Sequence, residues 1–285
     1  MVSVESFIPA GAAAFVISTS AFAADLPMPP VYAPPPPVVV EASGWYLRGD
    51  VGVGVQTFSQ FNLAPASAVP ATWIVNQQDI QDATILDFGV GYEFNNWLRF
   101  DVTGEYRTKA GFEALGSYLQ GACTVGGVTG TCFDKYSGNY SAAVFMANAY
   151  IDLGTWWCLT PYIGGGVGAA YNRISNVEDI GPLPNGTIGF GYTYNDSTSW
   201  NLAWNVQAGL TYNVNNNFKV DFSWRYVDLG APQSASIYCQ NTATCIANTF
   251  TLKDITSQDF RVGFRWMLQP EVAPVIMPPA LPTRG

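Results

Sequence analysis

The feature that most constrains the fold is an alternation of apolar and polar residues with a period of two, which recurs eight times along the chain. In the first such segment Leu47, Val51 and Val53 would share one face, and Arg48 and Asp50 would lie on the other. Successive side chains of a β-strand point to opposite faces of its sheet, so each segment predicts a strand with one apolar and one polar face. The predicted strands are 45–56, 86–94, 98–107, 140–153, 159–171, 200–214, 218–228 and 258–267.

The composition indicates where the apolar faces point. The chain is 48% hydrophobic and 14% aromatic but only 12% charged, which does not suit a soluble β-sandwich. Beyond the N-terminus there is no uninterrupted apolar run of about 18 residues, so a transmembrane helix is not expected. A closed barrel satisfies every backbone group in lipid with strands of about 9–11 residues. We therefore predict an all-β fold, an eight-stranded antiparallel transmembrane β-barrel over residues 45–268.

The connections between the predicted strands alternate in length. The short ones lie at 95–96, 154–157 and 215–217, and the long ones at 57–82, 108–139, 172–199 and 229–257. Short periplasmic turns and four long extracellular loops are typical of outer-membrane barrels, and eight strands place both chain ends on the periplasmic side. We interpret the aromatic residues at that side as an interfacial girdle, made of Trp45, Trp97, Trp156, Trp157, Phe218 and Trp266.

The polar faces carry many charged side chains of both signs. An unpaired buried charge is very costly, and the interior of an eight-stranded barrel is just filled by side chains. We expect a lumenal charge network that plugs the barrel, with a narrow selective channel and a buried acid–base site as alternatives. The predicted members are Arg48, Asp50, Asp87, Glu93, Arg99, Asp101, Glu105, Arg107, Asp152, Lys219, Asp221, Arg225, Asp259, Arg261 and Arg265.

The segments that flank the predicted barrel have a different composition. Residues 1–23 are interpreted as a signal peptide, in which small residues at 21 and 23 predict cleavage between Ala23 and Ala24. Residues 24–44 are rich in proline and predict an extended periplasmic arm, which at about 3.1 Å per residue would reach roughly 65 Å. Residues 269–285 form a second proline-rich tail.

Other chemistry is sparse. The chain has no histidine, which removes the commonest general base and metal ligand, and its net charge of −9 argues against a nucleic-acid partner. We expect no catalytic residues, no cofactor and no metal site, and we predict that the protein is not an enzyme.

Five cysteines fit an oxidising compartment. Cys123 and Cys132 share one long loop and Cys239 and Cys245 share another, so each pair is a candidate disulfide. Cys158, at the start of the fifth predicted strand, is left over.

Several motifs together resemble a known family. They are ADLP at 24–27, GWYLRGDVG at 44–52, NAYIDLG at 148–154, TPYIGGGVG at 160–168 and RVGFRW at 261–266. With these motifs the chain resembles the small outer-membrane β-barrel surface proteins of Rhizobiales-type alphaproteobacteria, within the OmpA-like barrel superfamily.

The resemblance implies a structural protein and exposed antigen of the bacterial outer membrane. Members that mature to an Ala-Asp N-terminus are implied to be joined covalently to peptidoglycan, here through Ala24 with Asp25 beside it. The expected partners are outer-membrane lipid and lipopolysaccharide, peptidoglycan and the barrel assembly machinery. Our first hypothesis is therefore a structural barrel that supports envelope integrity through this tether. A surface-loop binding protein (an adhesin or a haemin binder) and a small porin are the alternatives.

Overall fold

The protein is described by a computed structural model that covers residues 44–64, 73–118, 123–240 and 248–268. In these segments the chain forms fifteen β-strands. The same segments contain no helix that is long and apolar enough to cross a membrane.

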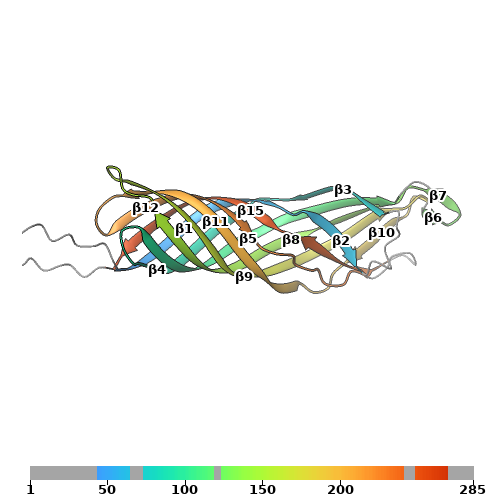
Figure 1. The fold of residues 1–285 in the computed structure, drawn as a ribbon. Helices are drawn as coiled ribbons and strands as arrows, with labels where there is room; N and C mark the ends of the chain where they lie inside the picture. Colours follow the sequence, from blue (N-terminus) through green and yellow to red (C-terminus); the bar gives the residue numbers. More distant parts are fainter. Residues whose placement is uncertain (1–43, 65–72, 119–122, 241–247, 269–285) are drawn as a thin grey trace, which may run out of the picture. The chain divides into compact units, whose positions relative to one another are not determined.

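Eight of the strands form a closed ring (Figure 1). In ring order, each strand pairs antiparallel with the next, and β15 closes the ring by pairing with β1. The predicted eight-stranded antiparallel barrel is therefore confirmed. Its strands are β1 (Gly44–Thr57), β4 (Ala83–Glu93), β5 (Leu98–Tyr118), β8 (Phe133–Asp152), β9 (Leu159–Pro182), β11 (Ser197–Asn213), β12 (Phe218–Asp228) and β15 (Thr256–Met267).

Two of the three short turns use the same side-chain device. The Asn95 carboxamide oxygen accepts hydrogen bonds from the backbone N–H groups of Trp97 and Leu98, at 3.0 and 2.8 Å. Asn215 does the same for the residues two and three positions further on, at 2.9 and 2.8 Å. Asparagine stabilises tight turns by bonding its own backbone in this way. The local sequence thus closes β4 onto β5 and β11 onto β12 without help from distant residues.

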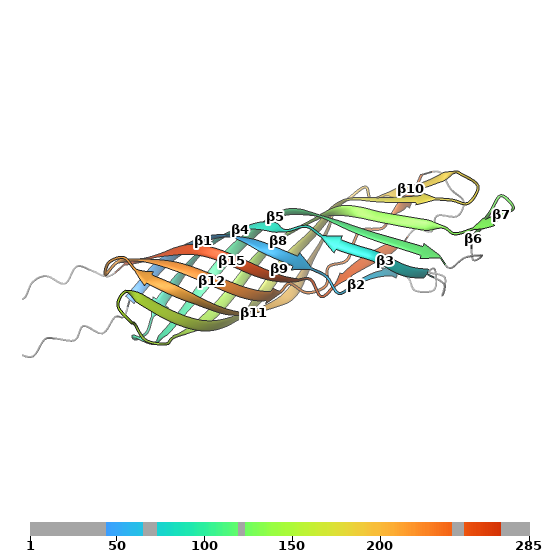
Figure 2. The same cartoon turned by 90° about the horizontal axis from the view of Figure 1, so that it is seen from above.

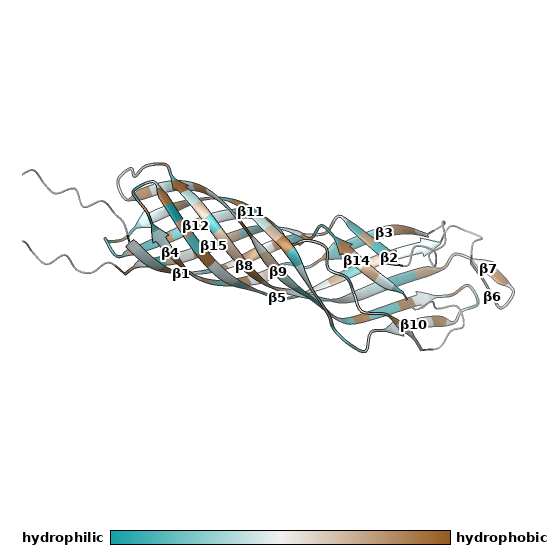
Figure 3. Cartoon of the chain, turned by 60° about the horizontal axis from the view of Figure 1, so that its bottom comes forward, coloured by the Kyte–Doolittle hydropathy of each residue, from teal (hydrophilic) through white to brown (hydrophobic). Residues whose placement is uncertain are grey.

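The outer surface of the barrel is apolar, as the alternation predicts. Hydrophobic and hydrophilic residues alternate along the barrel strands (Figure 3). Of the predicted girdle, the five tryptophans are exposed and Phe218 is half-buried. A second group of outward aromatic side chains, which the sequence analysis did not identify, lies toward the long-loop ends of the strands. Its members are Tyr106, Phe145, Tyr171, Trp200, Trp204, Trp224 and Tyr226. The two groups bracket the surface that faces lipid.

Three of the four long connections are largely β-structure, and the fourth, between β12 and β15, contains two short strands in its described part. The barrel strands β5, β8 and β9 continue far beyond the second aromatic group, and seven short strands join them (Figure 2). These are β2 (Gln60–Ala64), β3 (Trp73–Ile80), β6 (Cys123–Val125), β7 (Val128–Gly130), β10 (Ile188–Tyr192), β13 (Tyr238–Cys239) and β14 (Thr249–Lys253). We call this region the extracellular extension; it comprises residues 58–64, 73–82, 108–118, 123–141, 172–196, 229–240 and 248–255.

The extension was missed because its hydrophobic pattern is inverted relative to that of the barrel. In the barrel part of β5 the polar Arg107 points inward, whereas in the extension the inward residues are apolar, such as Phe112 and Ala114. A β-bulge between Arg107 and Ala110 shifts the register and changes which residues face inward. Outside lipid the outer face meets water, so apolar residues are buried inside and polar residues face out.

The inverted pattern encloses a second hydrophobic core above the charged lumen. The last long connection contributes Leu229, Ile237, Phe250, Leu252 and Ile255, all fully buried. They pack on inward residues of the extended strands, and the ring centroid of Phe250 lies 5.6 Å from that of Phe112. The extension and barrel belong to one compact unit. The charged lumen is therefore capped on its extracellular side by a packed apolar layer.

Candidate functional site

The structure directs all fifteen predicted lumenal side chains into the barrel. Thirteen of these residues are buried, and the side chains of Asp152 and Lys219 are only 12% and 17% exposed. Every one of the fifteen takes part in at least one ion pair. Strand alternation delivers them to the lumen, and ring closure brings opposite charges from distant strands within reach of one another.

The layer of charges nearest the extension is a square of two cations and two anions. Arg107 donates to Glu105 at 2.7 Å and to Asp259 at 2.5 Å. Arg225 donates to Asp259 at 2.8 Å and also bonds Glu105. All four side chains are at most 2% exposed, so each charge depends on its neighbours for compensation.

A middle layer is centred on Arg48. Its guanidinium donates to Asp50 at 2.9 Å, to Asp101 at 2.7 Å and to the Tyr150 hydroxyl at 2.6 Å. The carboxamide of Asn148 donates to the second oxygen of Asp101 at 2.8 Å. These bonds connect β1 to β5 and β8 across the lumen.

The layer nearest the periplasm contains Arg265, which donates to Asp221 at 2.7 Å and to Glu93 at 2.9 Å. Lys219 also donates to Glu93, at 2.8 Å. Beside this layer the guanidinium carbon of Arg99 lies 4.0 Å and 4.5 Å from the ring centroids of Tyr150 and Tyr162, respectively. Cation–π contacts of this kind help to hold a buried cation in place.

The charge network crosses the barrel at several levels. Arg261, for example, reaches from β15 to Asp87 on β4 at 3.3 Å and to Gln207 on β11 at 2.7 Å. An ion that passed along the barrel axis would have to break such bonds and then cross the apolar layer above them. This arrangement favours a filled structural interior over a channel.

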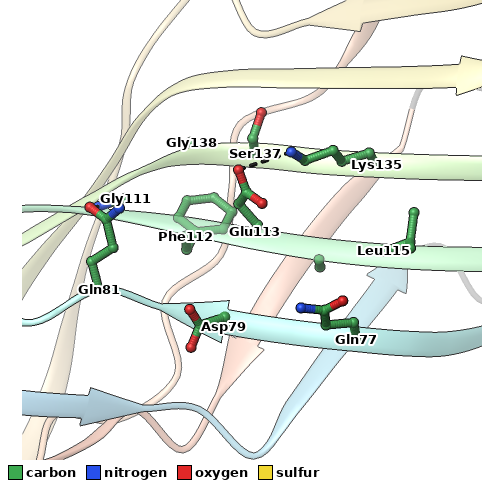
Figure 4. A pocket seen from close by; sticks show the side chains of 11 residues that line it. Gln77, Asp79, Gln81, Gly111, Phe112, Glu113, Leu115, Lys135, Ser137 and Gly138 are labelled. Atoms are coloured by element: carbon green, nitrogen blue, oxygen red, sulfur yellow. Dashed lines mark hydrogen bonds and ion pairs between the residues drawn. The ribbon is translucent and has the colours of Figure 1, made fainter.

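A groove of about 480 Å³ lies on the extension, and Figure 4 shows the side chains that line it. Residues of β3, β5 and β8 line it, among them Gln77, Asp79, Glu113 and Lys135. The Lys135 ammonium lies 2.9 Å from the Glu113 carboxylate, and both side chains are about half exposed to solvent. The groove offers polar contacts to a ligand, but its one ion pair is already satisfied.

A row of aromatic rings lies on the part of the extension built by β10 and β13. The ring centroids of Tyr192 and Tyr194 are 4.8 Å apart, and those of Tyr194 and Tyr238 are 4.7 Å apart. We call these three residues the tyrosine ridge. Tyr194 is 65% exposed and Tyr238 is 51% exposed, although tyrosine is on average only partly exposed in folded proteins. A hydrogen bond to Tyr194 raises the pKa of the Tyr192 hydroxyl.

Two carboxyl groups are largely enclosed within the extension. Asp134 on β8 and Asp179 on β9 lie beyond the lipid-facing surface, and burial raises the pKa of both. Burial followed by repulsion from Asp134 raises the pKa of Asp179 to about 7. Two like charges in one enclosed place are unfavourable, so this part of the extension favours the protonated form.

The cysteine predictions are tested only in part by the described residues. Cys132 and Cys239 are each disulfide-bonded. The side chain of Cys123 and all of Cys245 lie outside the described residues, so the pairings of Cys123 with Cys132 and of Cys239 with Cys245 stay predictions. Cys158 is a free, exposed cysteine at a periplasmic turn.

The predicted sites in the N-terminal region are Ala23, Ala24 and Asp25, and these also lie outside the described residues. The proposed segments 1–23 and 269–285, and the arm 24–44 apart from Gly44, do as well. Among the described residues, no group of three or more cysteine, aspartate or glutamate side chains is placed to hold a metal ion.

Comparison with known proteins agrees with this architecture. The family model described as outer membrane protein beta-barrel domain matches residues 11–267. The chain belongs to this outer membrane β-barrel family. Its place in the cell is therefore the bacterial outer membrane, with its strands in the lipid bilayer.

Individual proteins that are similar to this chain share a modest part of its sequence. A protein of Brucella abortus is 32% identical over 222 residues, which cover 73% of this chain and 76% of the relative. A protein of Rickettsia prowazekii named as a candidate adhesin is 29% identical over 177 residues, which cover 61% of this chain and 72% of the relative. Neisserial surface protein A has a similar structure with a TM-score of 0.43 and 16% identity, covering 80% of this chain and all of that one. Brucella is a member of the Rhizobiales, so the predicted resemblance is confirmed.

The first prediction concerns the charge square of this outer membrane barrel. The substitution Arg225→Met leaves Glu105 and Asp259 to share Arg107. Breaking a buried ion pair in this way lowers the free energy of unfolding by about 3–5 kcal/mol. We expect a lower free energy of unfolding in urea, measured with the barrel refolded into lipid vesicles. The control is Arg173→Met, which removes an exposed cation paired with Asp196 and is expected to change little. Equal effects of the two substitutions would contradict a structural role for the square.

The second prediction concerns the acidic pair of the extension. An acid whose pKa is raised on folding binds its proton more tightly in the folded than in the unfolded state, so stability falls as pH rises from about 4 to 7. We expect amides of the extension to exchange faster at pH 8 than at pH 5 after correction for the intrinsic exchange rate. Asp179→Asn should flatten this dependence, whereas Asp196→Asn, at an exposed ion pair, should preserve it. A dependence that survives in Asp179→Asn would exclude this residue as its source.

Proposed function

We propose that this protein is a non-enzymatic surface protein whose filled barrel anchors the extracellular extension as a platform for binding other surfaces. The observation that carries the proposal is the tyrosine ridge, in which Tyr194 and Tyr238 are exposed and Tyr192 is half-buried, on a folded scaffold and outside both cores. The outward barrel faces would contact lipid and lipopolysaccharide, and the barrel assembly machinery would insert the chain.

Tyrosine suits a recognition surface for physical reasons. Its ring contributes a large apolar contact area with only two side-chain torsions, and its hydroxyl forms hydrogen bonds at the edge of the contact. Contiguous exposed aromatic groups on a soluble surface commonly mark binding sites. The Rickettsia relative that is named as a candidate adhesin supports the same proposal.

The other hypotheses for the barrel receive less support. A small porin would need an open path, whereas ion pairs cross the described lumen and an apolar layer caps it. Haemin binding could not use a histidine ligand, because the chain has no histidine.

The third prediction tests the platform on intact cells. The triple variant Tyr192→Ser, Tyr194→Ser, Tyr238→Ser should bind a panel of eukaryotic cell surfaces at least about tenfold less than the parent, the size expected when central aromatic contacts are lost. Surface display is checked with an antibody to an added epitope. The matched control is Val128→Ser, an exposed apolar residue on the β6–β7 hairpin. Undiminished binding by a fully displayed triple variant would exclude the ridge as the binding site.

We also propose that the N-terminal arm tethers the barrel to peptidoglycan through Ala24. The supporting observation is the position of Gly44, where the described chain begins. Tyr46 is paired with Met267, and the backbone N–H of Leu268 donates to the Trp45 carbonyl at 2.8 Å, at the end of the barrel that carries the short turns. An arm that ends at Gly44 would join the barrel at this end, which the short turns assign to the periplasmic side, where the cell wall lies.

The fourth prediction is a direct chemical test of this tether. Mass spectrometry of protease-digested sacculi, boiled in detergent beforehand, should detect peptides that begin with Ala24-Asp25 linked to the diaminopimelate of peptidoglycan. Absence of such peptides from cells that contain abundant barrel would contradict the tether and leave the platform proposal standing.

A further inference from the structure

The ring of paired strands opens between β2 and β3 in the extracellular extension. In the barrel, β1 and β4 pair as far as Gly54 and Ala83. Beyond this point β1 leads into β2, which pairs with β14, and β4 is preceded by β3, which pairs with β5 (Figure 2). In the described part of the chain no backbone pairing joins β2 to β3.

A groove of about 350 Å³ lies in this split. Among the described residues its lining consists of two runs of four consecutive residues, 59–62 on one side and 75–78 on the other. Consecutive residues of a strand point to opposite faces, so a lining that includes every residue in each run is formed by the edges of the strands, not by one face. The groove is therefore bordered by backbone groups of two strand edges that face each other.

Glutamine side chains bridge the base of the split. The carboxamide of Gln78 donates to the backbone carbonyls of Phe58 and Ser59, at 3.1 and 3.0 Å. Just below, the carboxamide of Gln56 donates to the carbonyl of Gln81 at 3.0 Å. A side-chain carboxamide is chemically a free peptide group. At the base, amide donors from side chains thus occupy positions that the N–H groups of a neighbouring strand would otherwise fill.

The lining indicates the chemistry of an occupant. The eight residues are Ser59, Gln60, Phe61, Asn62, Val75, Asn76, Gln77 and Gln78, none of which is ionisable. A charged segment would lose hydration here without gaining a partner, whereas an uncharged extended peptide would find backbone and carboxamide donors and acceptors along both walls.

A bulge limits how long the occupant can be. The register of β3 on β5 shifts between Val75 and Gln77, and the intervening Asn76 donates its carboxamide to the Ser117 hydroxyl at 2.8 Å. Bulges interrupt continuous pairing along an edge strand. The part of β3 that follows the bulge, residues 77–80, is four residues long and spans about 13 Å.

We propose that the split between β2 and β3 accepts a short, uncharged, extended segment of a partner protein as an added β-strand. This mode of recognition obtains affinity from main-chain hydrogen bonds and selectivity from alternate side chains. The site is separate from the tyrosine ridge and shares with it only the extension on which both are built.

The test uses the full-length barrel in lipid nanodiscs and three octapeptides of alternating uncharged residues: Thr-Val, Ser-Ile and Asn-Tyr. Each peptide has a control of the same sequence that is N-methylated at alternate residues, which removes the donors of one strand edge. Hydrogen exchange of the barrel should slow in residues 60–64 and 73–80 with at least one unmethylated peptide and not with its control. The β6–β7 hairpin serves as the internal reference.

A variant pair locates the binding. Gln78→Glu replaces the bridging donor with a carboxylate and should weaken the peptide that binds by at least about tenfold. Gln233→Glu changes an exposed glutamine that bonds Thr249 on the far side of β14, and should leave binding unchanged. Retained adhesion of Gln78→Glu cells, with retained peptide binding by the tyrosine-ridge variant, would separate this site from the platform function.

Three outcomes would overturn the proposal. They are no protection of either strand by any of the three peptides up to about 1 mM, equal protection by methylated and unmethylated peptides, and equal affinity of Gln78→Glu and the parent protein.

Discussion

Closure of the backbone ring is the constraint on which the rest of this structure depends. Within lipid an unpaired peptide group costs several kcal/mol, so the pairing of β15 with β1 leaves no open edge along the barrel. Closure sends alternate residues into a narrow lumen, where charges from β1, β5, β12 and β15 are buried together. The square of Glu105, Arg107, Arg225 and Asp259 exists because each of these charges would be very costly alone.

The extension obeys the same strand geometry under a different solvent. Above the lipid-facing surface, water contacts the outside of the sheet, so the apolar residues lie inside and the polar residues outside. The bulge between Arg107 and Ala110 on β5 allows one continuous strand to serve both environments. On β9 the register shift near Asn176, whose φ is 52°, marks a similar change of facing. The barrel thereby presents a packed scaffold, not loose loops, to the outside of the cell.

Both proposed binding sites lie where closure is no longer required. Water can satisfy the backbone groups of an open edge, so β2 and β3 can part above the membrane although β1 and β4 cannot part within it. The tyrosine ridge likewise lies where water can form hydrogen bonds with the tyrosine hydroxyls. The filled lumen and the proposed tethering arm would hold this platform in place. In this proposal the interior of the barrel stabilises the fold, and the extracellular extension binds partners.

The sequence by itself determined the eight barrel strands, their order, the face that each residue takes within the barrel and the fifteen charged side chains of the lumen. Those features follow from a period of two and from tight turns such as that at Asn95, which are properties of neighbouring residues. Only the tertiary structure decided which charges pair, since Arg225 and Glu105 are 120 residues apart. The tertiary structure also decided the fold of the extension. Phe112 and Ala114 alternate with a polar residue as clearly as barrel residues do. Whether they face lipid or a core depends on the bulge in β5 and on Phe250, which packs against Phe112 from a distant segment. The tyrosine ridge and the split between β2 and β3 have no local signal, because each arises from strands whose partners are set by the whole ring.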